Sequence, residues 1–241
     1  MIELKNISKD FVGQNGIKSK IIKSISASIQ KSKITSFYAP HGSGPSYLLK
    51  IISGLEIQTE GSVLNPNSEK IIYIPTEPSS FPWYNVFENV KLGIVNYDLK
   101  AVEKMIKLAG LEGYESFHPY DKSYGFRFRI ALARSLAQSP GLILMDDPFK
   151  LMDNKTKSEI YSLILDINRT KGTTFCLASS NLDETLMLSD KIFIMSNEPS
   201  EIVYQTEVDI PAKRDLSVKK SDEYISVKTK IITEIKKFDV E

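Results

Sequence analysis

The sequence predicts an α/β fold with a largely parallel central sheet. Short apolar segments that resemble strands alternate along the chain with helical patterns, which is typical of an α/β domain. Several of these segments lack polar alternation, as expected for strands that are covered on both faces. The predicted strands are 2–7, 34–39, 70–75, 142–146, 173–178 and 191–196.

Helices are predicted between the strands and at the C-terminal end. Segment 99–109 carries apolar residues at helical spacing, and a second helix over 126–138 is ended by Pro140. An insertion of about fifty residues between two strands is too long for a loop, so we expect a helical subdomain at about 88–140. Segment 215–241 predicts a surface helix docked by one apolar face. That face consists of Ile225, Val227, Ile231, Ile232 and Ile235.

The composition is that of an ordinary globular protein, with 41% hydrophobic and 25% charged residues. The net charge of +1 gives no electrostatic reason to expect nucleic acid or an anionic membrane as the main partner. The charged start MIELKNISKDF and the absence of a long apolar run predict a soluble protein without a signal peptide or membrane span. The single cysteine, Cys176, excludes a disulfide framework and fits a reducing cytosol.

Residues 38–55, YAPHGSGPSYLLKIISGL, resemble a phosphate-binding loop that runs into a helix. Such a loop opens onto a helix N-terminus, where exposed N–H groups and the helix dipole bind phosphate. Gly42 and Gly44 permit close approach of a phosphate to the backbone. The alternative is a glycine-rich turn without a ligand. The residues predicted to surround a nucleotide are Ala39, Pro40, His41, Gly42, Ser43, Gly44, Pro45, Ser46 and Tyr47.

Pro45 occupies the position where a phosphate-binding loop has a lysine. Proline fits the first turn of a helix without strain, but it removes one N–H donor and the mobile positive charge. At an effective dielectric constant of ~20, two unit charges ~4 Å apart interact by up to about 4 kcal/mol before desolvation. His41 supplies at most a partial charge, because histidine is mostly neutral at pH 7.

Four longer segments resemble the ATP-binding subunits of ABC transporters, in the order of that family. The signature and its helix are resembled by residues 123–141, SYGFRFRIALARSLAQSPG. Residues 142–153, LILMDDPFKLMD, resemble the strand that follows, its acidic pair and the next loop. TEPSSFPWYNVFENVKLGI at 76–94 is similar to the permease-facing loop of importers of the nitrate, sulfonate and taurine type. EVDIPAKRD at 207–215 resembles the C-terminal segment of that group.

The resemblance implies the P-loop ABC-ATPase fold, in which a RecA-like core, an antiparallel β subdomain and a helical subdomain form a single nucleotide-binding domain over 1–241. It also implies Mg-ATP as the cofactor and an integral membrane permease, docked through about 76–94, as a partner. A second ABC ATPase subunit, unlike or identical, would complete the assembly. These partners imply a cytoplasmic location on the inner face of the cell membrane.

Several site residues of the family are retained. Phe11 matches the aromatic residue that stacks on adenine, although a phenylalanine there also suits core packing. Ser46 and Asp146 match the hydroxyl and carboxylate that hold Mg²⁺, and their simpler roles are helix capping and a strand-end carboxylate. Ser123 and Gly125 match the signature.

Other positions depart from the family pattern. Thr76 stands in place of a metal-binding glutamine, Ser180 in place of the switch histidine and Tyr124 in place of a signature glycine. Asp147 replaces the glutamate that polarises water and is shorter by about 1.5 Å, while a misplacement of about 1 Å can cost ~10²-fold in rate. We therefore expect weak or absent binding of Mg-ATP and impaired hydrolysis. A working ATPase with unusual residues and an interaction protein outside transport remain the alternatives.

Overall fold

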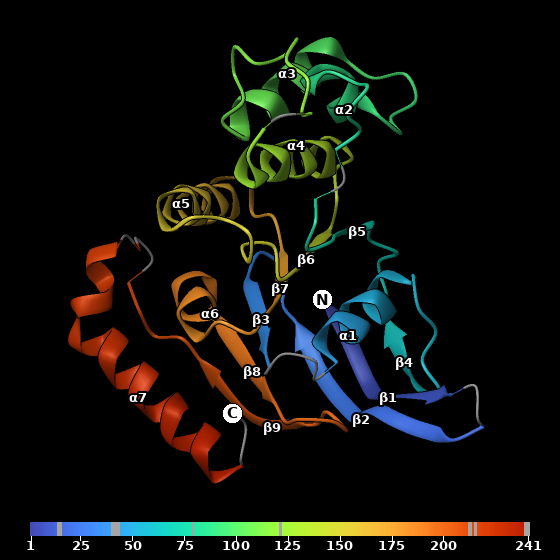
Figure 1. Cartoon of the computed structure of the whole chain (residues 1–241), viewed down its shortest axis with the longest axis vertical. Helices are drawn as coiled ribbons and strands as arrows, with labels where there is room; N and C mark the ends of the chain where they lie inside the picture. Colours follow the sequence, from blue (N-terminus) through green and yellow to red (C-terminus); the bar gives the residue numbers. More distant parts are fainter. Residues whose placement is uncertain are drawn as a thin grey trace.

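A large mixed sheet, a small antiparallel sheet and seven α-helices make up the described part of the chain (Figure 1). The computed structural model describes residues 1–13, 16–39, 44–78, 80–120, 122–211, 214 and 216–238. Within these residues the large sheet has the strand order β5-β6-β7-β3-β8-β9, in which β9 pairs antiparallel with β8 and the other neighbours are parallel. The predicted α/β class is confirmed. The strands are β3 (Ile34–Tyr38), β5 (Ile71–Ile74), β6 (Leu142–Asp146), β7 (Phe175–Ser179), β8 (Lys191–Met195) and β9 (Ile202–Glu207).

The antiparallel sheet consists, in the described residues, of β2 (Lys18–Ile29), β1 (Ile2–Val12) and β4 (Glu60–Leu64), in that order. The strand predicted at 2–7 is only the first half of β1. Asn6 and Ser24 both have a φ of 49°, and the register of β1 on β2 shifts in this region. These irregularities interrupt the two-residue alternation by which a half-buried strand is recognised in a sequence.

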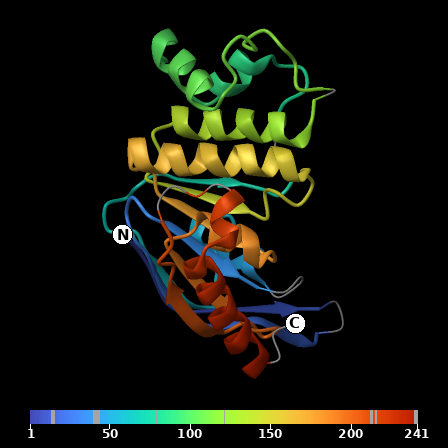
Figure 2. The same ribbon diagram turned by 90° about the vertical axis from the view of Figure 1, so that its left-hand side faces the viewer.

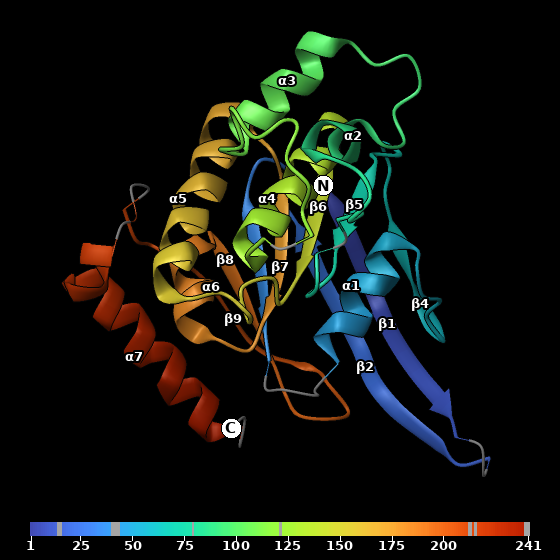
Figure 3. The same cartoon turned by 45° about the horizontal axis from the view of Figure 1, so that its top comes forward.

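Helices cover both faces of the large sheet (Figure 3). Helix α1 (Pro45–Ser53) shares one apolar cluster with β1, β2 and the sheet. On the other face the sheet packs with α4 (Tyr124–Ala137), α5 (Asn154–Lys171), α6 (Leu182–Leu188) and α7 (Asp222–Lys237). Burial on both faces explains why β6 and β7 are apolar along almost their whole length.

The chain between β5 and β6 forms α2 (Val86–Lys91), α3 (Leu99–Leu108) and α4 at one end of the molecule, where α4 runs alongside α5 (Figure 2). The three helices share a separate apolar cluster. Helix α4 begins two residues before the predicted start at 126, because the Phe126 N–H donates to Oγ of the capping residue Ser123 at 3.3 Å. Among the helices of the described residues, none combines the length and apolar character needed to cross a bilayer.

Helix α7 docks against α6 through a cluster of polar contacts on Asp183. The Tyr224 hydroxyl and Lys228 Nζ donate to Asp183 Oδ1 at 2.7 and 2.6 Å, and Lys219 Nζ lies 3.5 Å from Oδ2. Beside them Tyr224, Ile231 and Ile235 are buried. The predicted docked face was wrong at Ile225, which is 50% exposed, because Tyr224 occupies the buried position next to it.

The carboxylate of Asp183 makes this docking sensitive to pH. Burial alone would raise the pKa of Asp183, but the hydrogen bonds from Lys228 and Tyr224 and the charge of Lys219 lower it below its usual value of 3.8. Because the folded-state pKa is lowered, the contribution to stability is complete above the unfolded-state pKa and is lost as the pH falls through the folded-state pKa.

We expect Asp183→Asn to lower the free energy of unfolding by about 1 kcal/mol, as for a partly exposed charged hydrogen bond. Urea denaturation measures the difference in the free energy of unfolding between Asp183→Asn and the unmodified protein. This difference should be the same at pH 7 and pH 5 and should shrink only below about pH 4. Asp209→Asn, at an exposed aspartate, is the control. A difference that already declines between pH 7 and pH 5 would contradict this assignment.

Candidate functional site

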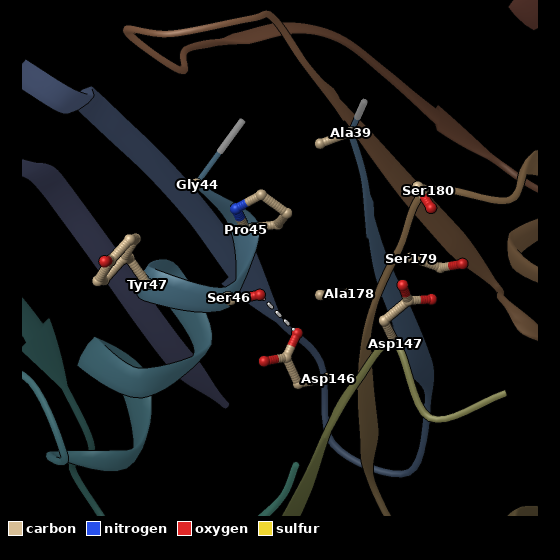
Figure 4. Close-up of a pocket in the computed structure, with 10 residues that line it drawn as sticks. All are labelled: Ala39, Gly44, Pro45, Ser46, Tyr47, Asp146, Asp147, Ala178, Ser179 and Ser180. Carbon is tan, nitrogen blue, oxygen red and sulfur yellow. Dashed lines mark hydrogen bonds between the residues drawn. The ribbon is translucent and has the colours of Figure 1, made fainter. Parts of the chain in front are cut away.

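A cavity of about 150 Å³ opens at the carboxyl edge of the large sheet (Figure 4). Strands β3, β6 and β7 are parallel neighbours in register, with Asp146 beside Ala178 and Tyr38 beside Ser179. Residues that follow these strands therefore meet at one edge, opposite the first turn of α1. The lining consists of Ala39, Gly44, Pro45, Ser46, Tyr47, Asp146, Asp147, Ala178, Ser179 and Ser180.

The cavity brings together many of the residues predicted to surround a nucleotide. Those from Gly44 to Tyr47 line it together with Ala39, Asp146, Asp147 and Ser180. Among the described residues, the predicted members that do not line it are Phe11, Thr76, Ser123 and Gly125. The remaining predicted loop residues, Pro40, His41, Gly42 and Ser43, lie outside the described residues.

Helix α1 presents its N-terminus to the cavity. Gly44 caps it with a left-handed φ of 87°, and a side chain there would meet Ile21 Cγ2 at 3.1 Å. The Leu48 N–H donates to the Gly44 carbonyl, so the N–H groups of Ser46 and Tyr47 precede the first hydrogen bond within the helix. With Pro45 at the first helical position, this turn offers N–H groups and a helix dipole to an anion but no lysine.

Asp146 accepts hydrogen bonds from two sides. Ser46 Oγ donates to Oδ1 at 2.8 Å, and the Tyr73 hydroxyl donates to Oδ2 at 2.6 Å. Burial, followed by the hydrogen bond to Asp146 and its charge, raises the pKa of Tyr73. A hydroxyl and a carboxylate in contact are oxygen ligands of the kind that Mg²⁺ prefers, so Ser46 and Asp146 fit the predicted metal site. Tyr73 was not predicted from the sequence.

Asp147 follows β6 in a strained backbone conformation. Its φ is 42°, and its N–H donates to the Ala178 carbonyl at 2.8 Å, which holds the turn against β7. Aspartate tolerates a positive φ better than most residues that have a side chain. Asp146 and Asp147 place two carboxylates in the cavity lining, whose described residues include no lysine or arginine, so an anionic ligand would need a cation beside it.

A buried ion pair fixes the strand end next to Ser180. Ser179 Oγ donates to Glu184 Oε2 at 2.9 Å, and Lys157 Nζ donates to Oε1 at 2.8 Å. The side chains of Glu184 and Lys157 are 4% and 18% exposed. This network joins β7, α5 and α6 directly behind the cavity, and sequence patterns did not indicate it.

Phe11 lies on β1 and contacts a residue of the loop itself. Its ring centroid is 4.9 Å from that of Tyr47, at an interplanar angle of 57°. Lys9 Nζ lies 5.0 Å from the Phe11 ring centroid, and Lys50 Nζ lies 5.5 Å from the Tyr47 ring centroid. Tyr47 thus points away from the Ser46–Asp146 pair (Figure 4) and packs on the ring that was predicted to stack on adenine.

The signature residues begin α4. Ser123 is exposed and caps the helix, while Gly125 is buried so close to Thr156 on α5 that a Cβ would lie 2.3 Å from its Cγ2. Tyr124 occupies the position between them, and the Arg127 guanidinium lies 5.4 Å from its ring centroid. The half-buried Tyr124 ring also packs against the main apolar cluster.

An exposed aromatic segment, 81–84, precedes α2. The rings of Phe81, Trp83 and Tyr84 lie within 5.5 to 6.2 Å of one another, and Trp83 is 66% exposed. The fully buried Asn89 holds the segment, because its amide donates to the carbonyls of Phe81 and Tyr84 and its Oδ1 accepts the Phe81 N–H at 2.8 Å. The backbone on both sides of the exposed Trp83 is therefore fixed by hydrogen bonds.

Comparison with known proteins identifies the family. Residues 22–150 match the family model for ABC transporters. The aliphatic sulfonates import ATP-binding protein SsuB 1 of Pseudomonas savastanoi pv. phaseolicola is 34% identical, over 81% of this chain and 82% of its own length. SsuB of Bacillus cereus is 30% identical, over 96% of this chain and 94% of its own. A solved dimeric bacterial ABC transporter cassette is 25% identical with a TM-score of 0.74, over 86% of this chain and 98% of that chain.

The chain therefore belongs to the ABC transporter family, among its ATP-binding subunits. The fold predicted from the resemblance, an ABC-ATPase fold with an antiparallel β-sheet beside a largely parallel one, is confirmed.

Proposed function

We propose that the protein is the ATP-binding subunit of an ABC importer, that it docks on a membrane permease from the cytoplasmic side, and that it binds Mg-ATP weakly and hydrolyses it slowly or not at all. The observation that carries this proposal is the composition of the cavity. It combines the N-terminus of α1 and the Ser46–Asp146 pair of a nucleotide site with Pro45 in place of the lysine. The import function of the SsuB relatives supports the transport role.

Two features of the cavity support weak nucleotide binding. Pro45 removes the cation that would offset the phosphate charge, while Asp146 and Asp147 add negative charge to the lining. The Phe11–Tyr47 contact supports the same conclusion for the base, since adenine could stack on that face of Phe11 only after Tyr47 moved. Mg²⁺ bound by Ser46 and Asp146 would neutralise phosphate oxygens, so residual affinity is expected.

The exposed aromatic segment 81–84 supports docking on a permease. Asn89 holds the backbone of Phe81 and Tyr84, and Trp83 between them is 66% exposed in this chain. Aromatic residues held rigidly at a surface are typical of the centre of protein interfaces. We assign the permease contact to about 76–94, which contains this segment.

A second ATPase subunit is part of the proposed assembly. A pair of identical chains would have Pro45 in both loops and Tyr124 in both signatures. An unlike partner with an intact loop, glutamate and histidine would form one site that uses Ser123 and Gly125 of this chain, and that site would lose less of its chemistry. We therefore favour an unlike partner, with an identical pair in a non-hydrolytic role as the alternative.

Two other functions remain as alternatives. The contact between Ser46 and Asp146, at 2.8 Å, favours a working ATPase that uses unusual residues elsewhere. An interaction protein outside transport would also retain the fold, and it is favoured only if no membrane protein accompanies the chain on purification.

A titration with ATP followed by thermal unfolding tests the nucleotide part of the proposal. Ligand that binds the folded state raises its stability by RT ln(1 + [L]/Kd), and we expect a Kd above ~100 μM. Pro45→Lys is expected to tighten binding by at least ~1 kcal/mol, about fivefold, because it restores a charged phosphate contact.

Pro45→Ala is the matched control, since it restores the N–H group without the charge. Its affinity should lie closer to that of the unmodified protein than to that of Pro45→Lys. If Pro45→Lys leaves the affinity unchanged, the loop is not a phosphate cradle in this protein.

A further inference from the structure

We propose that Tyr73 is a positioning residue for the metal ligand Asp146, and that its hydroxyl fixes the orientation of the carboxylate by holding one oxygen while the other faces Ser46 and the cavity. The inference rests on the proposed function, because it assumes that Asp146 holds the Mg²⁺ of Mg-ATP. Tyr73 itself is not assigned a contact with the metal or the nucleotide.

The strand register explains why a tyrosine reaches this carboxylate. Tyr73 on β5 pairs with Leu144 on β6, two residues before Asp146. Two residues along a strand span about 6.6 Å, so only a long side chain that leans along the strand can make the contact. Its hydroxyl does so at 2.6 Å.

The two hydrogen bonds on Asp146 go to different carboxylate oxygens. Ser46 donates to Oδ1 from the cavity, where both residues belong to the lining. Tyr73 donates to Oδ2 and belongs instead to the lining of a second cavity, of about 320 Å³, together with Phe81 and Arg134. The carboxylate is thus held at Oδ2 by a group that does not line the nucleotide cavity, while Oδ1 is directed to Ser46.

These two contacts differ in what a metal ion would do to them. A cation held by Ser46 and Oδ1 needs the lone pairs of the serine hydroxyl, so Ser46 must turn its proton away from Asp146. The Tyr73 hydrogen bond to Oδ2 is compatible with such a cation. Once the Ser46 hydrogen bond is lost, the Tyr73 hydrogen bond alone restrains the carboxylate. Outer partners of this kind commonly change metal affinity by about 10- to 100-fold when they are removed.

Binding of Mn²⁺ to the whole protein, without nucleotide, tests the inference. Mn²⁺ replaces Mg²⁺ as a probe, and the relaxation of water protons reports weakly bound Mn²⁺ directly. The unmodified chain is expected to show a Mn²⁺ site that Asp146→Asn removes. Tyr73→Phe, which keeps the ring and removes only the hydroxyl, is expected to weaken this site about 10-fold. If Tyr73→Phe does not fold, Tyr73→Met, which also lacks a donor, replaces it with the same expected loss.

Tyr38→Phe is the matched control, because it removes the hydroxyl of a half-buried tyrosine on β3, a strand of the same sheet that pairs with neither β5 nor β6. Its Mn²⁺ affinity should equal that of the unmodified protein. A Mn²⁺ site that depends on Asp146 but is unchanged in Tyr73→Phe overturns the role of Tyr73 and leaves the proposed metal site standing. A chain with no Mn²⁺ site that depends on Asp146 overturns the metal part of the proposed function and this inference with it.

Discussion

Mixed with Mg-ATP, the purified chain is expected to turn over at least ~10²-fold more slowly than an ABC ATPase with the full set of family residues. Three deficits act together in the cavity. Pro45 supplies no cation, Asp147 is one methylene shorter than glutamate, and Ser180 has no imidazole. Pro45→Lys alone is expected to improve binding without restoring turnover, because activation of water and the switch position are still deficient. Release of phosphate, measured against a no-protein blank, is the assay.

The triple change Pro45→Lys, Asp147→Glu, Ser180→His is expected to recover measurable turnover if two subunits close around the nucleotide. Glutamate at 147 must adopt the φ of 42° that aspartate has now, which is less favourable for the longer side chain, so the recovery should be partial. Adding Asp146→Asn to the triple variant should abolish the recovered activity, because it removes the metal ligand. Turnover of the unmodified chain within ~10-fold of an ordinary family member would establish the working ATPase instead.

The second large effect is expected at the permease contact. Trp83→Ala should reduce recovery of the permease with this chain by ~10-fold or more, since exposed aromatic residues that become buried in an interface often contribute over 2 kcal/mol. Co-expression with the permeases and ABC ATPases of its source, followed by purification from solubilised membranes, measures the recovery and identifies the second subunit.

Val95→Ala serves as the control, because Val95 is an exposed apolar residue, 86% exposed, just outside the assigned segment. Equal loss in both variants would mean that Trp83 has no special role. Recovery of the chain without any membrane protein would favour the interaction protein outside transport. A complex of this chain and a permease alone that still transports with ATP would refute both the unlike partner and the catalytic loss.

The parts of the fold that the sequence predicts are those with an unbroken local pattern. Segment 142–146 was predicted with its bounds as observed, because β6 is buried throughout and reads as one apolar run. Strands β2 and β4 were not predicted individually, because Ser24 with a φ of 49° interrupts the alternation of β2, and β4 is only five residues long and contains Gly61. The docked face of α7 was wrong at Ile225, because helical spacing alone cannot tell which neighbouring side chains the protein covers.

In the candidate site, too, the residues of local motifs could be predicted and the contacts between distant segments could not. Ser46 and Asp146 were predicted because each belongs to a local motif, and the structure brings them to 2.8 Å. Tyr73, Glu184 and the contact of Phe11 with Tyr47 depend on residues that are distant in the sequence and meet only through the register of the sheets. The apolar run of β5 marks Tyr73 as a strand residue, but no local pattern indicates that its hydroxyl reaches Asp146.

The carboxyl edge of the large sheet separates residues that maintain the fold from residues that would perform chemistry. Strands β6 and β7 are fully buried, whereas Pro45, Asp147 and Ser180 follow strands or begin a helix and are only partly covered. Substitutions away from a packed core usually change stability by no more than about 0.5 kcal/mol. Folding therefore constrains Ser180 much less than it constrains the strands, whereas the φ of 42° at Asp147 keeps a constraint there, so catalytic residues around one scaffold differ in how freely they can change.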